Sequence, residues 1–291
     1  MSTITQTQTT TSKHIQIEQE QDAQSALTWD LSNTEPLHHI PTFTDKHAER
    51  AWAKGKMAAA FRTFARLGWA DGASGHVSLR DPVNPEHFWI NPYAVHFAQM
   101  KASDLVLVDH EGKQVMPTKH KVNAAGFIIH SSIHKARPDI NAAVHLHSPY
   151  GRAWSAFGKG LDMVNQDACM FHRNLAVYEG FGGVVLAAEE GARLADALGS
   201  DKQHLILQNH GLLTCGGTVD EAAAYFIALE RACEGQILVE QASASGLQRK
   251  FVGEEEAEYT YANTGIPKVA YMQFQPEFDL TVELSGGEVL K

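Results

Sequence analysis

The spacing of apolar residues along the chain predicts several amphipathic helices. In the first, large apolar side chains recur three or four residues apart, from the capping pair Thr44-Asp45 to about Leu67. This spacing puts them on one face of the helix, which we expect to be buried. The same pattern predicts further helices over about Val122 to Ala136, Glu189 to Leu198 and Glu221 to Ala244. In the last of these, the predicted buried positions include Ala224, Ile227, Ala228, Leu238 and Val239.

Short apolar runs between turn residues predict β-strands. The runs are His76–Leu79, His87–Ile90, Leu105–Val108, Ala142–His145, His204–Leu207 and Leu212–Cys215. Helices and strands alternate over much of the chain, but some neighbouring strands have the short separation that is typical of hairpins. We therefore predict an α/β protein with three layers, α/β/α, around a central sheet that is mixed and largely antiparallel.

The two ends of the chain differ in composition from its middle. Residues 1–44 are polar, repetitive and too poor in large apolar side chains to offset the entropy of ordering. We expect them to form a disordered or loosely docked arm. Residues 45–250 contain no clear linker and are expected to form one domain. Residues 251–291 are expected to form a C-terminal extension that wraps around this domain.

The charge balance and the cysteines narrow the classes of partner and compartment. The chain has 24 basic and 34 acidic residues, a net charge of −10, which argues against nucleic acid or an anionic membrane as a partner. A small molecule is the expected partner. No apolar run approaches the roughly 18 to 20 residues of a membrane helix, and the N-terminus lacks the apolar core of a secretory signal. Three cysteines without a CxxC pair favour a reducing, cytoplasmic compartment.

Two histidines stand two residues apart at the end of a predicted strand. Alternate residues of a strand point to the same face, so the imidazoles of His145 and His147 can converge on one ion. Leu146, between them, is expected to point into a core. His210 also follows an apolar strand and precedes Gly211, so we expect it at a strand end as well.

The three histidines together predict a site for one divalent metal ion. Neutral imidazoles suit Zn²⁺, Mn²⁺, Fe²⁺ or Co²⁺, and a site with three protein ligands leaves a position open for catalysis. A histidine pair with this spacing also occurs in strands that bind no metal, and the spacing alone leaves this alternative open. Glycine-rich motifs that bind phosphate are absent from the sequence, so no nucleotide cofactor is predicted.

Two further histidines share one face of the predicted helix over about Val122 to Ala136. His130 and His134 are four residues apart and therefore lie one above the other. They could serve the metal site as ligands or as groups that surround the ligands. A solvated or half-buried pair without a catalytic role is the more common meaning of such spacing.

Several segments, in a fixed order, resemble the class II aldolase/adducin family. They are Ser74-Gly75-His76-Val77-Ser78, Trp89-Ile90-Asn91-Pro92, residues 101–109, Ala136-Arg137-Pro138-Asp139, His145-Leu146-His147-Ser148 and Gln208-Asn209-His210-Gly211-Leu212. The resemblance covers roughly Ala51 to Ala244. It implies an α/β/α domain, a homotetramer with sites near subunit boundaries, and zinc or a similar ion on the three histidines. Such an ion polarises a carbonyl or ene-diolate, as retro-aldol cleavage and decarboxylation both require.

The sequence departs from the family pattern at positions that matter for the chemistry. The glutamate that serves the aldolases as general acid and base falls at Gly126, and the phosphate-binding serines are absent from residues 119–125. His76 stands where the family has asparagine, and Tyr93-Ala94 where it has Ser-Gly. We therefore expect a substrate without phosphate. The candidates for proton transfer are Asp167, which otherwise reads as a turn or capping residue, His130, His134, and a metal-bound water.

These observations favour a metal-dependent carbon–carbon lyase, an aldolase or decarboxylase that acts on a non-phosphorylated carbonyl or hydroxy-acid substrate. One alternative is an adducin-like assembly module with altered or lost catalysis. The missing glutamate favours this alternative, and the three retained histidines argue against it. An epimerase or dehydratase on the same metal site is a further alternative that the sequence leaves open.

Overall fold

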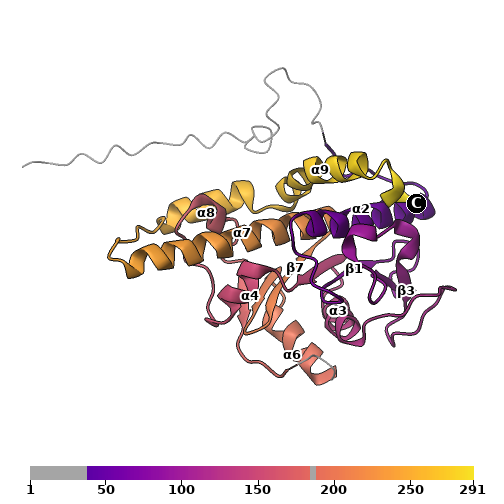
Figure 1. Ribbon diagram of the computed structural model, residues 1–291, viewed down its shortest axis with the longest axis horizontal. Helices are drawn as coiled ribbons and strands as arrows, with labels where there is room; N and C mark the ends of the chain where they lie inside the picture. The colour runs from indigo at the N-terminus through magenta and orange to yellow at the C-terminus, as the bar shows by residue number, and fades with distance from the viewer. Residues whose placement is uncertain (1–37, 184–187) are drawn as a thin grey trace, which may run out of the picture. The chain divides into compact units, whose positions relative to one another are not determined.

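A central β-sheet organises the structure, a computed structural model that describes residues 38–183 and 188–291 (Figure 1). Most of the arm predicted over residues 1–44 therefore lies outside the described residues. The strands are β1 (His76–Arg80), β2 (Phe88–Ile90), β3 (Val106–Val108), β4 (Ala142–Leu146), β5 (Leu175–Tyr178), β6 (His204–Leu207) and β7 (Gly211–Gly216).

These strands form one mixed sheet in the order β3-β2-β1-β4-β7-β6-β5. The neighbouring strands are antiparallel except for β5 and β6, which run parallel. β1 and β4 lie side by side, with His76 directly opposite His145. The prediction of a mixed, largely antiparallel sheet is confirmed.

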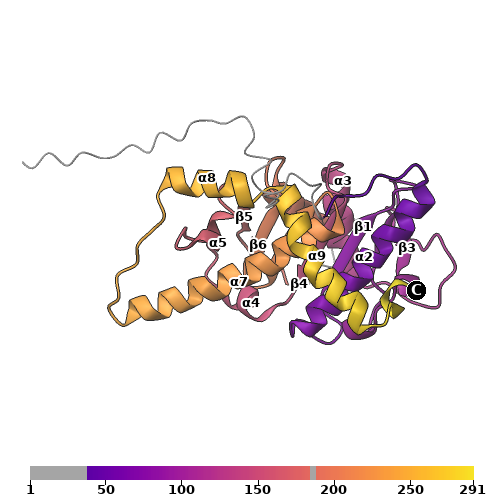
Figure 2. The ribbon, with the colours of Figure 1, turned by 90° about the horizontal axis from the view of Figure 1, so that it is seen from above.

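Helices cover both faces of this sheet (Figures 1 and 2). On one face, α2 (Lys46–Arg66), α7 (Val219–Ala244) and α9 (Pro267–Leu284) share a large apolar core with the sheet. On the other face, α3 (Ala124–Ala136) and α6 (Ala188–Leu198) form a second core with it. The two cores contain alternate residues of the same strand, because Val144 packs in the first and Ala143 in the second. The predicted three-layer α/β/α architecture is therefore confirmed.

Most predicted helices and strands agree with the structure to within a few residues, but several elements were not predicted. These are β5, α4 (Pro149–Ser155), α5 (Gln166–Cys169), α8 (Glu254–Thr264), α9 and the short turns η1 (Phe97–Gln99), η2 (Ala102–Asp104) and η3 (Glu288–Leu290). α9 has Pro276 inside it, a residue that normally argues against a helix interior. None of the described helices is long and apolar enough to span a membrane.

One predicted core position in the longest helix is wrong. Ala224 and Ile227 of α7 are buried as expected, but the side chain of Leu238 is 56% exposed. The C-terminal part of α7 extends away from the sheet (Figure 2), so its apolar residues have less of the domain to pack against.

A buried polar cluster joins α9 to the helices beside it. The Lys56 ammonium of α2 lies 2.9 Å from Asp220 Oδ1 and donates to Gln275 Oε1 of α9 at 2.7 Å. Gln275 Nε2 in turn donates to Asp220 Oδ1 at 2.7 Å. Through these contacts α9 contributes to the same layer as α2 and α7, although the boundaries proposed at residues 44 and 250 stay predictions.

Candidate metal centre

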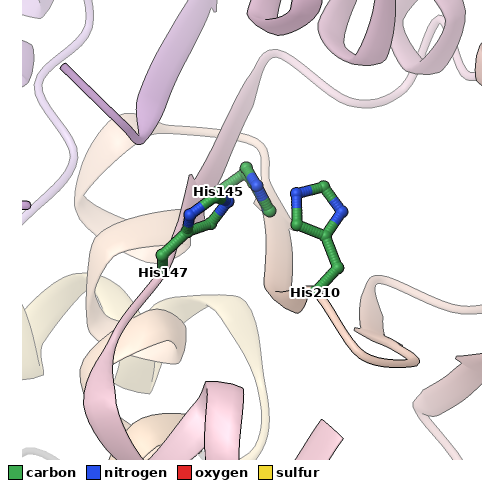
Figure 3. A group of neighbouring side chains, drawn as sticks. All are labelled: His145, His147 and His210. Atoms are coloured by element: carbon green, nitrogen blue, oxygen red, sulfur yellow. The ribbon is translucent and has the colours of Figure 1, made fainter. Parts of the chain in front are cut away.

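Three histidines from β4, its end, and the turn between β6 and β7 come together at one point (Figure 3). His145 is in β4, His147 follows the end of this strand, and His210 lies in the turn between β6 and β7. One ligand nitrogen from each lies within 4.8 Å of the others. The centroids of their rings are 4.7 to 5.2 Å apart. The three side chains therefore lie close together, as the sequence predicted.

The turn that carries His210 fits closely against β4. Asn209 has a left-handed backbone with φ 58°, and the next two residues lead directly into β7. A Cβ on Gly211 would be only 2.9 Å from the carbonyl oxygen of Leu146. Glycine at this position lets the turn approach the histidine strand, which brings His210 to the other two rings.

A buried glutamate binds the segment that follows His147 in sequence. The carboxylate of Glu230 in α7 accepts hydrogen bonds from the Ser148 hydroxyl and from the backbone N–H groups of Tyr150 and Gly151, the latter two at 2.8 and 2.7 Å. These donors are at the start of α4, where a helix has backbone N–H groups without partners in the helix. The end of the histidine strand is thereby tied to the long helix α7.

The hydrogen bonds of His145 fit the role of a metal ligand. Its Nδ1 lies 2.9 Å from the carbonyl oxygen of Leu212, which can only accept, so Nδ1 carries the hydrogen. Nε2 is then an unprotonated nitrogen, and it is buried without a hydrogen-bond partner. A buried polar atom without a partner is costly. A divalent ion between the three rings would give this atom a partner.

All three imidazoles are held in the neutral form that binds metal. Burial lowers the pKa of His145 well below its usual value and lowers the pKa of His210 to about 4. The pKa of His147 is also lowered, first by burial and then by the charge of Arg152. Because metal competes with protons for these nitrogens, neutral rings at ordinary pH favour binding.

A cavity of about 610 Å³ opens next to the histidines, a size that suits a small organic molecule. His147 and His210 line it together with Tyr93, Phe181 and Arg152. Among its described lining residues, Arg152 is the one that carries a full positive charge, and its guanidinium is 3.0 Å from the Asp71 carboxylate. The cavity therefore offers aromatic walls and a single, already paired cation.

The structure does not bring Asp167 to this cavity. Asp167 is in the short helix α5 and lines another pocket, together with Arg231 and Glu277. Within one chain it is therefore away from the three histidines. A role for Asp167 in proton transfer stays a prediction that would require a neighbouring subunit.

His130 and His134 are completely buried in the interior rather than solvated or half-buried. Both project from α3, and neither is among the described residues that line the cavity. His130 Nδ1 is 2.6 Å from the hydroxyl oxygen of Ser78, and His134 Nε2 is 2.7 Å from the same oxygen. Burial lowers the pKa of both, that of His134 to about 3, so both rings are neutral.

The residue that connects them to the cavity is His76, to which the sequence assigned no role. Its Nδ1 is 3.2 Å from His130 Nε2, its ring stacks on that of His145 at 5.1 Å, and it lines the cavity. Its ring also fills the space in front of Gly126, where an added Cβ would be 2.5 Å from His76 Cδ2. The sequence signal that could have pointed to it was the departure from the family pattern, since His76 stands where the family has asparagine.

Comparisons with known proteins agree with this architecture. Residues 55–237 match the family model described as Class II Aldolase and Adducin N-terminal domain. The chain is 40% identical to Decarboxylase NovR of Streptomyces niveus over 238 residues, 81% of this chain and 86% of that protein. It is 37% identical to 4-hydroxy-3-prenylphenylpyruvate oxygenase/4-hydroxy-3-prenylbenzoate synthase of Streptomyces roseochromogenus over 247 residues, 84% of this chain and 87% of that protein.

A solved structure is similar over nearly its whole length. L-fuculose 1-phosphate aldolase from Glaciozyma antarctica superposes with a TM-score of 0.80 and 40% sequence identity, covering 92% of this chain and 99% of that one. On the basis of the family model and these relatives, the chain belongs to the class II aldolase and adducin family.

Proposed function

We propose that the protein is a metal-dependent carbon–carbon lyase, an aldolase or decarboxylase, that acts on a carbonyl or hydroxy-acid substrate without phosphate. The observation that carries the proposal is the buried, unpartnered Nε2 of His145, which lies beside two further neutral imidazoles at the wall of a cavity. One divalent ion per chain, most simply Zn²⁺, would be held by His145, His147 and His210. When bound, such an ion stabilises the negative charge that develops on a substrate oxygen.

The residues around the cavity favour an organic acid over a sugar phosphate. Phosphate recognition usually combines several charged or backbone donors, whereas Arg152 is the one cation among the described lining residues and is already paired with Asp71. A single arginine of this kind suits the carboxylate of an organic acid. Tyr93 and Phe181 supply apolar surface for a ring or chain next to it.

The names of the relatives point to two substrate classes. NovR is named a decarboxylase, and the Streptomyces roseochromogenus protein is named for an aryl 2-oxo acid and a benzoate. The Glaciozyma antarctica protein is named for a sugar phosphate. The single paired arginine of the cavity supports the first class for this chain, and decarboxylation of a 3-oxo or hydroxy-aromatic acid ranks level with retro-aldol cleavage.

A second candidate function is oxygen-dependent cleavage of an aryl 2-oxo acid. It is favoured by the relative that is named an oxygenase, and by the ligand set, because three imidazoles suit Fe²⁺ as well as Zn²⁺. An adducin-like assembly module and an epimerase or dehydratase remain alternatives on the same fold. They differ from both enzymes in releasing neither carbon dioxide nor a smaller carbonyl compound.

One experiment separates these functions. The purified protein is analysed for metals, and then assayed in air and under argon with 2-oxo acids, 3-hydroxy acids, hydroxybenzoates and sugar phosphates. A lyase should form product equally fast in both atmospheres, whereas an oxygenase should stop under argon. If the protein contains no stoichiometric divalent ion, or if chelation leaves turnover unchanged, the proposal is wrong.

We also propose a homotetramer in the cytoplasm, with a neighbouring chain closing each site. Exposed apolar side chains on and after the distal part of α7, namely Leu238, Leu247 and Phe251, support an interface there. The three cysteines are buried and free, which supports a reducing compartment. Light scattering should give a mass of about four times the 31.9 kDa of one chain. A monomeric mass at micromolar concentration would argue against this assembly.

A further inference from the structure

A chain of four hydrogen bonds runs through the interior from the cavity to a backbone carbonyl. It begins at His76 Nδ1, which is 3.2 Å from His130 Nε2. It continues from His130 Nδ1 to the Ser78 hydroxyl at 2.6 Å and from that hydroxyl to His134 Nε2 at 2.7 Å. It ends at the Ile140 carbonyl, 3.2 Å from His134 Nδ1. All four side chains are buried, and His76 is the member that lines the cavity.

The far end of the chain sets the direction of every bond. A carbonyl oxygen only accepts, so Nδ1 of His134 must carry the hydrogen toward Ile140. Arg80 donates to the backbone carbonyl of His134 at 2.7 Å, and the positive charge that it brings near the imidazole disfavours a second charge on the ring. His134 is therefore neutral, and its Nε2 accepts from the Ser78 hydroxyl.

The same reasoning assigns the hydrogens on Ser78, His130 and His76, the groups that lie closer to the cavity. Since the single hydrogen of the Ser78 hydroxyl goes to His134, the Ser78 oxygen accepts from Nδ1 of His130. A neutral His130 then has an unprotonated Nε2, which accepts from Nδ1 of His76. His76 is left with an unprotonated Nε2 that the chain of bonds does not use.

The residue that carries this nitrogen lines the part of the cavity next to α3. Nε2 of His76 lies 3.0 Å from the place of a Cβ on Gly126, and residues 122–125 line the cavity beside it. No side chain projects from Gly126 to cover it. The histidine ring stacks on the ring of His145, so Nε2 is also close to the three-histidine cluster.

We propose that His76 is a substrate-binding residue whose Nε2 accepts a hydrogen bond from a hydroxyl group of the substrate, and that Ser78, His130 and His134 are positioning residues that hold it in this tautomer. This inference rests on the proposed function for the existence of a substrate at the cluster. It adds a selection rule. A ligand with a hydroxyl at this place is accepted, whereas a carboxylate or ketone oxygen there would face a lone pair and is rejected.

The chemistry of the cavity then defines the substrate class more closely. Arg152 suits an anionic end, the three histidines suit a metal-bound oxygen, and His76 requires a hydrogen-bond donor. A hydroxy acid carries all three features in one small molecule. We therefore expect a hydroxy acid to bind better than the matched acid that lacks the hydroxyl.

The tautomer of His76 can be measured without any substrate. In protein with ¹⁵N-labelled histidine, loaded with Zn²⁺ or used as purified, two-bond ¹H–¹⁵N spectra distinguish protonated from unprotonated ring nitrogens. We expect His76 to have a protonated Nδ1 and an unprotonated Nε2. A protonated Nε2 in the wild-type protein overturns the proposal, and this measurement requires no folded variant and no known activity.

Ser78→Ala tests the positioning residues, with Ser131→Ala as a matched control. Ser131 is next to His130 in α3, but its hydroxyl donates to the Ile128 carbonyl outside the chain of bonds. Ser78→Ala should convert His76 to a mixture of tautomers while the metal content stays unchanged, and Ser131→Ala should leave the spectrum as in wild type. If the His76 tautomer is unchanged in Ser78→Ala, the chain of hydrogen bonds does not determine this tautomer.

Matched acids test the substrate-binding role. The labelled zinc protein is titrated with lactate and propionate, and with 3-hydroxybutyrate and butyrate. At least one hydroxy acid should bind roughly three- to tenfold more tightly than its partner and shift the His76 Nε2 signal, the size of effect expected for one hydrogen bond. Equal affinities in both pairs would refute the acceptor role. An enzyme without lyase activity that still passes these tests would contradict the proposed function alone.

Discussion

Replacing Gly126 by alanine should strain the protein in a way that depends on His76. A Cβ at this position would be 2.5 Å from Cδ2 and 2.7 Å from Cγ of the His76 ring. Ordinary carbon contacts are about 3.5 to 4.0 Å, so the ring would have to move by roughly 1 Å. That movement is opposed by its hydrogen bond to His130 and by its stacking on His145.

Two opposing effects determine how much Gly126→Ala changes the free energy of unfolding. Alanine is favoured over glycine inside a helix by up to about 1 kcal/mol. Overpacking of a well-packed interior costs about 1–3 kcal/mol. Gly126→Ala should therefore be between neutral and about 2 kcal/mol destabilising in the wild type. In a His76→Ala background the obstacle is gone, and the same substitution should stabilise by up to about 1 kcal/mol.

The assay is a double-mutant cycle measured by urea unfolding. All four proteins are compared at one protein concentration in the presence of a chelator, because assembly and metal binding would otherwise add to stability. A coupling free energy of about 1–3 kcal/mol between positions 76 and 126 is expected. Gly235→Ala in α7 serves as the control, and its effect should be the same with and without His76.

The result that would refute this reasoning is additivity. If Gly126→Ala changes the free energy of unfolding equally in both backgrounds, the His76 ring does not occupy the space in front of Gly126. The hydrogen-bond chain that begins at His76 would then also lose its geometric basis. A coupling with the opposite sign would have the same consequence.

Four further outcomes are expected. His145→Ala should lose most of the bound metal by elemental analysis, since it removes one of three ligands, and retention would contradict the site. Deletion of residues 1–40 should leave the melting temperature nearly unchanged, because polar sequence buries little area; a large drop would mean that the arm docks. Asp167→Asn should lower turnover by no more than a few-fold, and a loss near ~100-fold would show that Asp167 reaches a neighbouring site. Burial lowers the pKa of His204 to about 3, whereas this imidazole binds a proton near pH 6.5 in the unfolded protein. His204 should therefore contribute about 1.4 kcal/mol per pH unit to the loss of stability as the pH falls from about 6.5 to 3. His204→Phe should lose stability less steeply than the wild type over this range, and an equally steep loss would exclude this histidine as a source.

Much of the fold could be predicted because its signals are local. The helix α2 and the short strands β4, β6 and β7 each follow from the spacing of apolar residues near one another in sequence. The burial of α2 is not confined to the predicted face, because every residue from Gly55 to Phe61 is buried. β5 was not predicted, because its four residues are only partly buried and show no clear alternation of apolar and polar side chains. The exposure of Leu238 depends on where the sheet ends beneath α7, which no local pattern contains.

The candidate site also contains residues that local sequence patterns predict and residues that they do not. The pair His145 and His147 could be predicted because alternate residues of a strand share a face. His130 and His134 could be placed on one helix face, but not under the sheet, since that requires the packing of α3. The contact of His130 with His76 joins residues 54 positions apart, so the spacing of residues along the sequence could not predict it.

Two departures from the family pattern form one physical change. A glutamate at position 126 would need a Cβ in the space that the His76 ring fills, and a histidine at position 76 needs a neighbour without a Cβ. A glutamate at position 126 and a histidine at position 76 would clash with each other, so the two positions are expected to change together. A buried histidine also needs a partner for each ring nitrogen that faces the interior, which His130 provides, and His130 in turn needs Ser78 and His134. The replacement of one carboxylate by one imidazole at the cavity is therefore accompanied by a chain of polar groups between β1 and α3 that ends at the Ile140 carbonyl.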